Sequence, residues 1–350
     1  MPSRSSLAVL VLTLGLVLAA CGGPSRAPSG ASPSGGAAPS GEPTQEPVAL
    51  RVGLGYLPSV QFAPFYLADQ QGYYREAGLT VEFQNKIDPD LIALVGQGSI
   101  DVGLADGTSV IPAVSQGIPV RYVATVYGRF PSVVFAKVSS GITRPADLAG
   151  KRLGIPGRYG SSWIMLQALL KSANLTPEDL DIVEYPDFGQ GTAVAADAVE
   201  AATGFVNNEP VQLERNGEPV TVLHVDEVVP LPGNGLIVGA ATLETKRDAI
   251  SGFVAATLRA MEEIRTDPQA GLDASVAAVP DLGTAADVQR AILNATIDTW
   301  TGPEQEARGL GAIDSGDWDT SIAYLESLGL VPNPVSADDM IDTGLLPVGD

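Results

Sequence analysis

Two asparagines and a glutamate follow an apolar strand in the segment GFVNNEP, residues 204–210. Open α/β sheets present the carboxyl ends of their strands to bound ligands. Glu209 could accept hydrogen bonds from an amino group and a ring N–H, and Asn207 or Asn208 could pair with a carbonyl and an N–H together. The alternative is a polar turn before Pro210, because asparagine tolerates unusual backbone angles. We expect the first of these two roles, in which the asparagines and the glutamate form hydrogen bonds to a small polar ring.

Two loops earlier in the chain offer further contacts. In GYLPSVQF, Tyr56 could stack on a flat ring, which is worth about 0.5–1.5 kcal/mol beyond the area that it buries, and Gln61 could add a hydrogen bond. Alternatively, Tyr56 could pack in the hydrophobic core and make no contact with a ligand. Asp106 and Thr108 follow another apolar strand, where they could contact a ligand or cap a helix. Both loops therefore supply candidate ligand contacts.

The segment GRYGSSW, residues 157–163, precedes a predicted helix. Free backbone N–H groups near Ser161 and Ser162 would suit an anion or a carbonyl oxygen, and Tyr159 adds an aromatic surface. The segment is not a phosphate loop, because the glycine spacing differs and no Lys-Ser/Thr pair follows. Plain helix capping is the alternative. Two more candidates lie in VYGRFP, where the chain should leave its first half, namely Tyr127 and Arg129.

The elements that must position these residues alternate between strand and helix, which is typical of α/β sheets. In the first half we expect strands at 49–56, 79–85, 100–106 and 119–127, with helices at 62–78, 88–99 and 107–117. The second set has strands at 133–140, 151–157, 181–186 and 202–208, with helices at 144–150, 160–175 and 191–201. Two returning strands are expected at 219–225 and 235–243, and the chain is mainly helical beyond residue 249.

This pattern predicts an α/β fold of two lobes. The simplest arrangement returns the chain to its first unit, so that lobe 1 consists of 48–130 plus 229–350 and lobe 2 of 131–228. Two crossing segments, near 127–132 and 225–235, would join the lobes.

The N-terminus has the features of a processing signal rather than of a fold. Residues 1–20 contain Arg4 followed by an apolar run too short to span a bilayer comfortably. The run ends in LAAC, which looks like the lipobox of bacterial lipoproteins, so we expect a lipoprotein signal peptide cleaved before a lipidated Cys21. Residues 21–47 are rich in glycine, proline and serine and should form a flexible tether. The predicted location is the extracytoplasmic face of the cell membrane.

Composition excludes several classes of function. The formal net charge of −21 disfavours a nucleic-acid-binding or acidic-membrane-binding surface. The single cysteine is Cys21, and the single histidine, His224, lies within a predicted strand and is interpreted as structural. No metal cluster or base-activated nucleophile can be drawn. We therefore expect no cofactor, no metal and no enzymatic activity.

Four segments together resemble solute-binding proteins of the thiamine-pyrimidine and nitrate/sulfonate/taurine group. They are VGLGYLPSVQFAPFYLADQQGYYREAGLTVEF, GSIDVGLADGTSVIPAVSQGIPVRYVA, RPADLAGKRLGIPGRYGSSW and AVEAATGFVNNEPVQLE. The resemblance covers roughly residues 50–240 and implies a periplasmic-binding-protein-like fold that closes on a small ligand at a cleft between its two lobes. It also implies that the protein passes this ligand to an ABC permease in the cytoplasmic membrane. We expect the protein to be a monomer.

The same resemblance bears on individual residues. Tyr56 stands where related proteins often carry an aromatic that stacks on the ligand, and Glu209 stands where their glutamate contacts a pyrimidine. The group also contains a synthase that makes the thiamine pyrimidine, with chemistry that uses a histidine, a lysine and a cysteine-rich motif. This chain lacks such a motif, so the synthase is the least favoured alternative.

The ligand is expected to be a flat, largely neutral heteroaromatic molecule, because aromatic residues recur at the candidate strand ends. They are Tyr56, Tyr127, Tyr159 and Phe188. The amino-acid sequence looks most similar to members of this family that are associated with riboflavin. The formylaminopyrimidine precursor of thiamine is the close alternative as ligand. A sulfonate, taurine or nitrate site would need converging cations, for which only Arg129 and Arg158 are at hand. A lipoprotein that senses its ligand for a membrane partner stays open as well.

Overall fold

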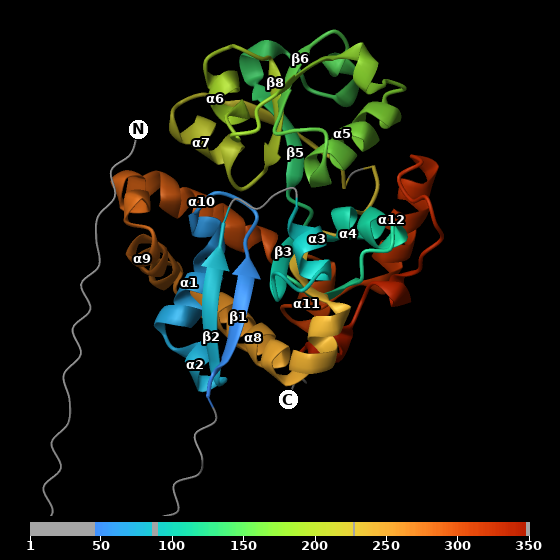
Figure 1. Ribbon diagram of the computed structural model, residues 1–350. Coiled ribbons are helices and arrows are strands. Elements are labelled where there is room, and N and C mark those ends of the chain that lie inside the picture. Colours follow the sequence, from blue (N-terminus) through green and yellow to red (C-terminus); the bar gives the residue numbers. More distant parts are fainter. Residues whose placement is uncertain (1–45, 86–89, 227, 348–350) are drawn as a thin grey trace, which may run out of the picture. The chain divides into compact units, whose positions relative to one another are not determined.

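The computed structural model describes residues 46–85, 90–226 and 228–347, which belong to one compact unit (Figure 1). The predicted signal peptide, the lipidation site Cys21 and the predicted tether up to residue 45 lie outside the described residues. None of the helices in the described part of the chain is both long and apolar enough to cross a lipid bilayer.

The first sheet has five strands in the order β2-β1-β3-β10-β4. Their bounds are β1 Val48–Gly53, β2 Leu79–Gln84, β3 Val102–Asp106, β4 Val120–Thr125 and β10 Asn234–Gly239. β1 is parallel to β2 and β3, whereas β10 is antiparallel to β3 and β4. A strand from late in the chain therefore lies between two strands formed much earlier.

The second sheet repeats this plan in the order β7-β6-β8-β5-β9. Its strands are β5 Ser132–Lys137, β6 Arg152–Ile155, β7 Asp181–Glu184, β8 Ala201–Phe205 and β9 Val220–His224. Here β5 is the antiparallel strand, paired with β8 and β9. The chain passes to this sheet between β4 and β5, and it returns to the first sheet between β9 and β10.

Helices complete both units. Around the first sheet they are α1 Ala63–Gln70, α2 Tyr73–Glu76, α3 Leu91–Gly96, α4 Gly107–Ser115, α8 Ala240–Thr266, α9 Pro268–Ala278, α10 Ala286–Thr299, α11 Pro303–Arg308 and α12 Ser315–Ser327. The second sheet carries α5 Gly160–Ser172, α6 Gln190–Ala195 and α7 Glu209–Arg215. Short 3₁₀ turns occupy Val60–Phe62, Val138–Ser140, Pro145–Leu148, Pro177–Asp179, Pro280–Ala285, Ala337–Asp339 and Thr343–Leu345.

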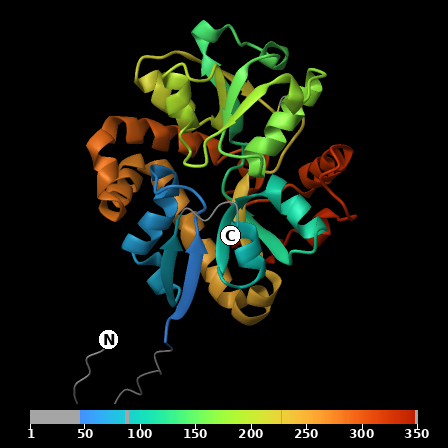
Figure 2. The ribbon, with the colours of Figure 1, turned by 45° about the horizontal axis from the view of Figure 1, so that its top comes forward.

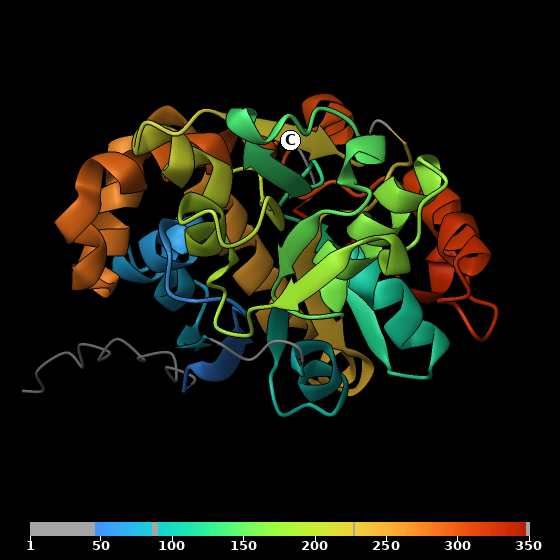
Figure 3. The same ribbon diagram turned by 90° about the horizontal axis from the view of Figure 1, so that it is seen from above.

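Each sheet is buried on both faces, because successive side chains of a strand point to opposite sides. In β10, Leu236 and Val238 belong to one core and Ile237 to another. Phe253 of α8 packs in the first of these cores and Trp318 of α12 in the second. Figures 2 and 3 show the C-terminal helices, in orange and red, around the blue and teal elements of the first sheet.

Three expected elements differ from the observed ones. The helix expected at 62–78 is divided into α1 and α2, because Gly72 has a left-handed backbone (φ 76°). The returning strand expected at 235–243 ends at Gly239, and α8 starts directly after it. No helix was expected after GFVNN, yet α7 begins at Glu209, since a proline in the first turn favours the start of a helix.

Candidate functional site

A cavity of about 360 Å³ lies between the two sheets. From the first sheet it is lined by Leu54, which follows β1, and by the carboxyl end of β3. Asn234, the first residue of β10, also lines it, because the antiparallel register places this residue beside Asp106. The second sheet contributes Pro156 after β6 and the carboxyl end of β8. The cavity thus lies where strand ends from both sheets meet, as open α/β sheets favour.

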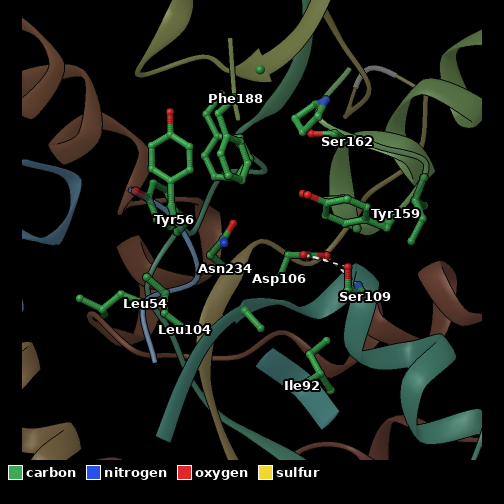
Figure 4. A pocket seen from close by; sticks show the side chains of 18 of the residues that line it. Leu54, Tyr56, Ile92, Leu104, Asp106, Ser109, Tyr159, Ser162, Phe188 and Asn234 are labelled. Carbon is green, nitrogen blue, oxygen red and sulfur yellow. Dashed lines mark hydrogen bonds between the residues drawn. The ribbon is translucent and has the colours of Figure 1, made fainter. Parts of the chain in front are cut away.

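Aromatic rings face the cavity from opposite sides (Figure 4). Tyr56 and Phe188 lie together on one side, with ring centroids 4.8 Å apart in an edge-to-face arrangement. Phe188 has a positive φ of 60°, which is unusual for a bulky residue, so a tight turn holds its ring toward Tyr56. Tyr159 lies across from them, with Asn234 and Asp106 between. Flat aromatic surfaces therefore flank the space.

Glu209 is 7% exposed and stands at the lobe 2 end of the cavity. The backbone N–H of Phe205 donates to its Oε2 (2.9 Å), and Nε2 of Gln190 donates to its Oε1 (3.3 Å). Burial raises the pKa of this carboxyl from 4.5 to about 7, and the backbone hydrogen bonds oppose the shift only in part. A Cβ on Gly204 would come within 2.7 Å of Oε2, so the carboxylate lies flat against a glycine backbone.

The two neighbouring asparagines have different partners. Nδ2 of Asn208 donates to the Tyr56 hydroxyl (3.1 Å), which links the two lobes beside the cavity. Burial, followed by the charge of Glu209, raises the pKa of Tyr56, so its hydroxyl stays neutral. Asn207 has 0% exposure and lies outside the cavity lining. Its Nδ2 donates to Oε1 of Gln61 (3.1 Å) and to Oγ1 of Thr296 (2.8 Å). Asn207 thereby fixes Gln61, which does line the cavity.

Asp106 caps α4, as expected of one of its two possible roles, and it also lines the cavity. Its Oδ1 accepts the N–H of Ser109 (2.6 Å), and its Oδ2 accepts the Ser109 hydroxyl (2.9 Å). Thr108, only two residues further on, is fully buried outside the cavity, where its hydroxyl donates to the Pro232 carbonyl (3.2 Å). The structure therefore brings Asp106 to the cavity but not Thr108.

The start of α5 reaches the cavity through Tyr159, Ser161 and Ser162. The hydroxyl of Ser161 is 2.9 Å from that of Ser132, and this hydrogen bond joins α5 to β5. Tyr127 also lines the cavity, with its ring 6.3 Å from that of Phe205.

The two arginines considered as ligand contacts do not reach the cavity lining. Nε of Arg129 donates to the carbonyl of Thr301 (3.0 Å), and Nε of Arg158 pairs with Glu184 (3.2 Å). Among the described residues that line the cavity, none is lysine, arginine or histidine, and the charged ones are Asp106 and Glu209. The described part of the lining is thus largely polar and aromatic, with two acidic side chains.

Sequence reasoning did not single out Gln190, Asn234 or Ser109, although all three line the cavity. Gln190 follows the same rule as the residues that were chosen, because it comes after a predicted strand, whereas Asn234 lies at the start of one. Gln190 Oε1 and Asn234 Oδ1 are both buried without a hydrogen-bond partner in the described part of the chain. These two buried oxygens therefore have unused hydrogen-bonding capacity at the edge of the cavity.

His224 lies on β9, the edge strand of the second sheet, and does not line the cavity. Its side chain is 38% exposed, with Nδ1 3.9 Å from Asp226. Within the ranges 46–85, 90–226 and 228–347, no group of three or more histidine, cysteine, aspartate or glutamate residues is arranged to hold a metal ion.

Comparison with known proteins places the chain in a family. Residues 59–271 match the family model described as NMT1/THI5 like. The riboflavin-binding protein RibY of Chloroflexus aurantiacus is 33% identical over 97% of this chain and 98% of that protein. The chain belongs to the NMT1/THI5-like family. The resemblance predicted from the sequence is thereby confirmed.

This NMT1/THI5-like chain has relatives of two kinds. A formylaminopyrimidine-binding protein of Halalkalibacterium halodurans is 26% identical over 83% of the chain and 88% of that protein. The 4-amino-5-hydroxymethyl-2-methylpyrimidine phosphate synthase of Legionella pneumophila is also 26% identical, over 66% of the chain and 74% of the synthase. Binding proteins and enzymes thus share this family.

Solved structures establish the fold of this NMT1/THI5-like chain. The alkanesulfonate-binding protein SsuA of Xanthomonas axonopodis, solved with MOPS, superposes with a TM-score of 0.68 at 18% identity, over 85% of the chain and 99% of SsuA. A Candida albicans protein described as having the generic periplasmic binding protein fold gives a TM-score of 0.62 at 17% identity, over 84% and 96%. The predicted two-lobed α/β fold is confirmed.

Proposed function

We propose that this protein is the extracytoplasmic solute-binding component of an ABC importer and that it captures a small heteroaromatic vitamin, with riboflavin as the favoured ligand. The lining of the cavity carries the proposal, because aromatic rings flank it and no described lining residue is a cation. Ligand pockets of about 300–1,000 Å³ with apolar walls and a few polar groups are typical of small-molecule sites. Full-length similarity to a riboflavin-binding protein supports the choice of ligand.

Each lining group has a role in this proposal. Tyr56, Phe188 and Tyr159 flank a flat ring system and exclude water from its faces. Glu209 accepts a ring N–H, and the charge of its ionised form strengthens that hydrogen bond. Asn208 acts mainly through Tyr56, because its amide is shared between the Tyr56 hydroxyl and Gln212. Binding then needs no covalent step, and the ligand is released unchanged.

Formylaminopyrimidine is the second candidate, and Glu209 favours it too, since a buried carboxylate can accept an amino N–H as well as a ring N–H. A sulfonate, taurine or nitrate fits less well, because such an anion would face the carboxyl groups of Asp106 and Glu209 in the described lining. The synthase stays the least favoured alternative, because the chain lacks the cysteine-rich motif that the chemistry of the synthase is expected to use.

The remaining parts of the proposal concern location and delivery. We place the protein on the outer face of the cytoplasmic membrane, held by a lipid on Cys21, and we expect it to act as a monomer beside a permease. A lipoprotein that reports ligand to another membrane partner would use the same cavity. Uptake measured in cells with and without the neighbouring permease separates these two roles.

Side-by-side calorimetric titration with riboflavin, the formylaminopyrimidine and taurine tests the proposal. Riboflavin should bind, and its emission should be quenched because the ring lies among aromatic side chains. Tyr56→Leu should weaken binding by at least about two- to tenfold through the lost ring contact. Tyr324→Leu, away from the cavity, is the matched control. Heat from taurine alone would refute the heteroaromatic ligand, and heat from the pyrimidine alone would replace riboflavin by the second candidate.

A further inference from the structure

Gln190 and Glu209 form a hydrogen-bonded pair where the helices of the second sheet reach the cavity. Gln190 is the first residue of α6 and Glu209 the first of α7, and both line the cavity. Nε2 of Gln190 donates to Oε1 of Glu209 at 3.3 Å, while the backbone N–H of Phe205 donates to Oε2 at 2.9 Å. Each oxygen of the carboxyl group therefore already accepts one N–H.

Glycines pack tightly around this pair. A Cβ on Gly204 would come within 2.7 Å of Oε2 of Glu209, and one on Gly191 within 3.0 Å of its Cγ. A Cβ on Gly154 would lie 3.1 Å from the Cβ of Gln190. Because the backbone lies so close to both side chains, the carboxyl group keeps its place at the cavity, and it changes mainly by gaining or losing a proton.

The hydrogen bonds of the pair favour the ionised form of Glu209. A backbone N–H can only donate, so Phe205 holds Oε2 as an acceptor. The Gln190 amide can turn and offer its Oε1, which is buried without a partner in the described part of the chain, to a protonated carboxyl group. A hydrogen bond to an ionised carboxylate is nevertheless about twice as strong as one between neutral groups. Gln190 thus stabilises the carboxylate more than the carboxylic acid.

Burial acts in the opposite direction, because it raises the pKa of Glu209 to about 7. Among the described residues, the neighbouring elements α6 and β8 carry no titratable side chain. The other titratable or charged residues on α7 and on the elements packed against it are Glu214, Arg215, His224, Asp287, Arg290 and Asp298. With Glu209, the titratable residues of the described lining are Tyr56, Asp106, Tyr127 and Tyr159. The charge of Glu209 therefore changes close to neutral pH, and replacing Glu209 separates its titration from that of its neighbours.

We propose that Gln190 is a positioning residue that keeps Glu209 as a hydrogen-bond acceptor and thereby directs the cavity toward ligands that present an imide N–H. This inference rests on the proposed function, because it takes riboflavin, whose ring carries one imide N–H, as the ligand. An ionised carboxylate only accepts hydrogen bonds, so a protonated Glu209 has to lose its proton before this N–H can bind. Gln190 should therefore set the pH at which riboflavin binding weakens.

Quenching of flavin emission between pH 5.5 and pH 8.5 gives the Kd of riboflavin across this range. The Kd of the parent protein should be about tenfold higher at pH 6 than at pH 8, with a midpoint near pH 7. Gln190→Met keeps the length of the side chain without its donor. The midpoint should then rise by at least about 0.5 pH unit, so that affinity falls at least about threefold at pH 6 and less than about twofold at pH 8.5.

Three comparisons complete the experiment. Glu209→Gln should remove the dependence of the Kd on pH, because an amide does not titrate. Gln167→Met, on α5 outside the cavity lining, is the matched control and should leave the midpoint unchanged. Riboflavin methylated at its imide nitrogen should bind the parent protein at least about tenfold more weakly at pH 8, because it has lost the hydrogen bond to the carboxylate.

The outcomes separate this inference from the proposed function. Failure to bind riboflavin at any pH would overturn the proposed function, and this inference with it. A Kd that is constant from pH 5.5 to pH 8.5 would overturn the inference alone and leave riboflavin binding in place. The same holds for a midpoint that stays in place in Gln190→Met or in Glu209→Gln, and for equal affinity toward the methylated flavin. Gln190→Leu, a second variant without the donor, gives the same readout if the methionine variant does not fold.

Discussion

Replacing Glu209 by glutamine should stabilise the folded protein at alkaline pH. Burial raises the pKa of Glu209 from 4.5 to about 7, so the folded state holds its proton more tightly than the unfolded chain does. The stability associated with that proton is fully present below pH 4.5, is lost as the pH rises to about 7, and stays lost above it. This change in pKa corresponds to about 3 kcal/mol between the two protonation states.

Glu209→Gln removes this dependence, because an amide does not titrate. The local contacts allow the change if the amide of Gln190 turns over, so that its Oε1, rather than the Nε2 that now donates to Glu209, faces the introduced amide and accepts from it. We therefore compare the free energy of unfolding of the variant with that of the parent at each pH. The variant's value relative to the parent should be about 2–3 kcal/mol higher at pH 8 than at pH 5. Urea unfolding at these two pH values measures it. Glu214→Gln, an exposed change on the same helix α7, serves as the control.

A difference between variant and parent that stays constant from pH 5 to pH 8 would refute the reasoning, because it would mean that Glu209 does not titrate differently on folding. Under the proposed function, the same variant should bind riboflavin about ten- to a hundredfold more weakly, since a hydrogen bond to a charged group contributes about 1.5–3 kcal/mol. Stability and affinity are thus expected to change in opposite directions at pH 8.

Two further predictions concern other parts of the chain. Cys21→Ser should abolish labelling by a fatty-acid analogue and leave the protein unprocessed or released, whereas labelling that persists would show that the lipid is attached elsewhere. Asn207→Ala should lower the free energy of unfolding by about 1–3 kcal/mol, because Gln61 Oε1 loses its buried donor; unchanged urea unfolding would show that this hydrogen bond between the lobes adds no stability.

The alternation of apolar strands and helices was enough to predict the fold. In each sheet the central strands are buried on both faces, and such strands appear in the sequence as nearly continuous apolar runs. Helix starts were harder to place. Pro210 was interpreted as the end of strand pairing, although proline is equally suited to the first turn of α7. Local patterns do not distinguish these two roles, because tertiary packing decides between them.

Most candidate ligand-binding residues were selected by one rule, namely that polar residues at the ends of strands face the cleft. The rule could not separate Asn207 from Asn208, because the backbone between them turns one amide toward Gln61 and Thr296 and the other toward Tyr56. Arg129, chosen for its place near the predicted crossing between the lobes, donates from its Nε to the carbonyl of Thr301, 172 positions away. Such partners are set by the assembled fold and leave no trace in the local sequence. Asn234 was overlooked because it begins a strand, and only the antiparallel insertion of β10 brings it to the cavity.

The close approach of Glu209 to Gly204 has an evolutionary consequence. An alanine at position 204 would place its methyl 2.7 Å from the carboxylate and 2.8 Å from the buried ring of Phe135, and the Phe205 N–H prevents the carboxylate from moving aside freely. A side chain at position 204 is thus constrained by two neighbours, whereas a change at position 209 is not constrained by the glycine. Among descendants of a common ancestor, a methyl at 204 should appear only where both residue 209 and residue 135 leave room for it. Glycine at 204 should therefore persist in lineages whose residue 209 changes with the ligand.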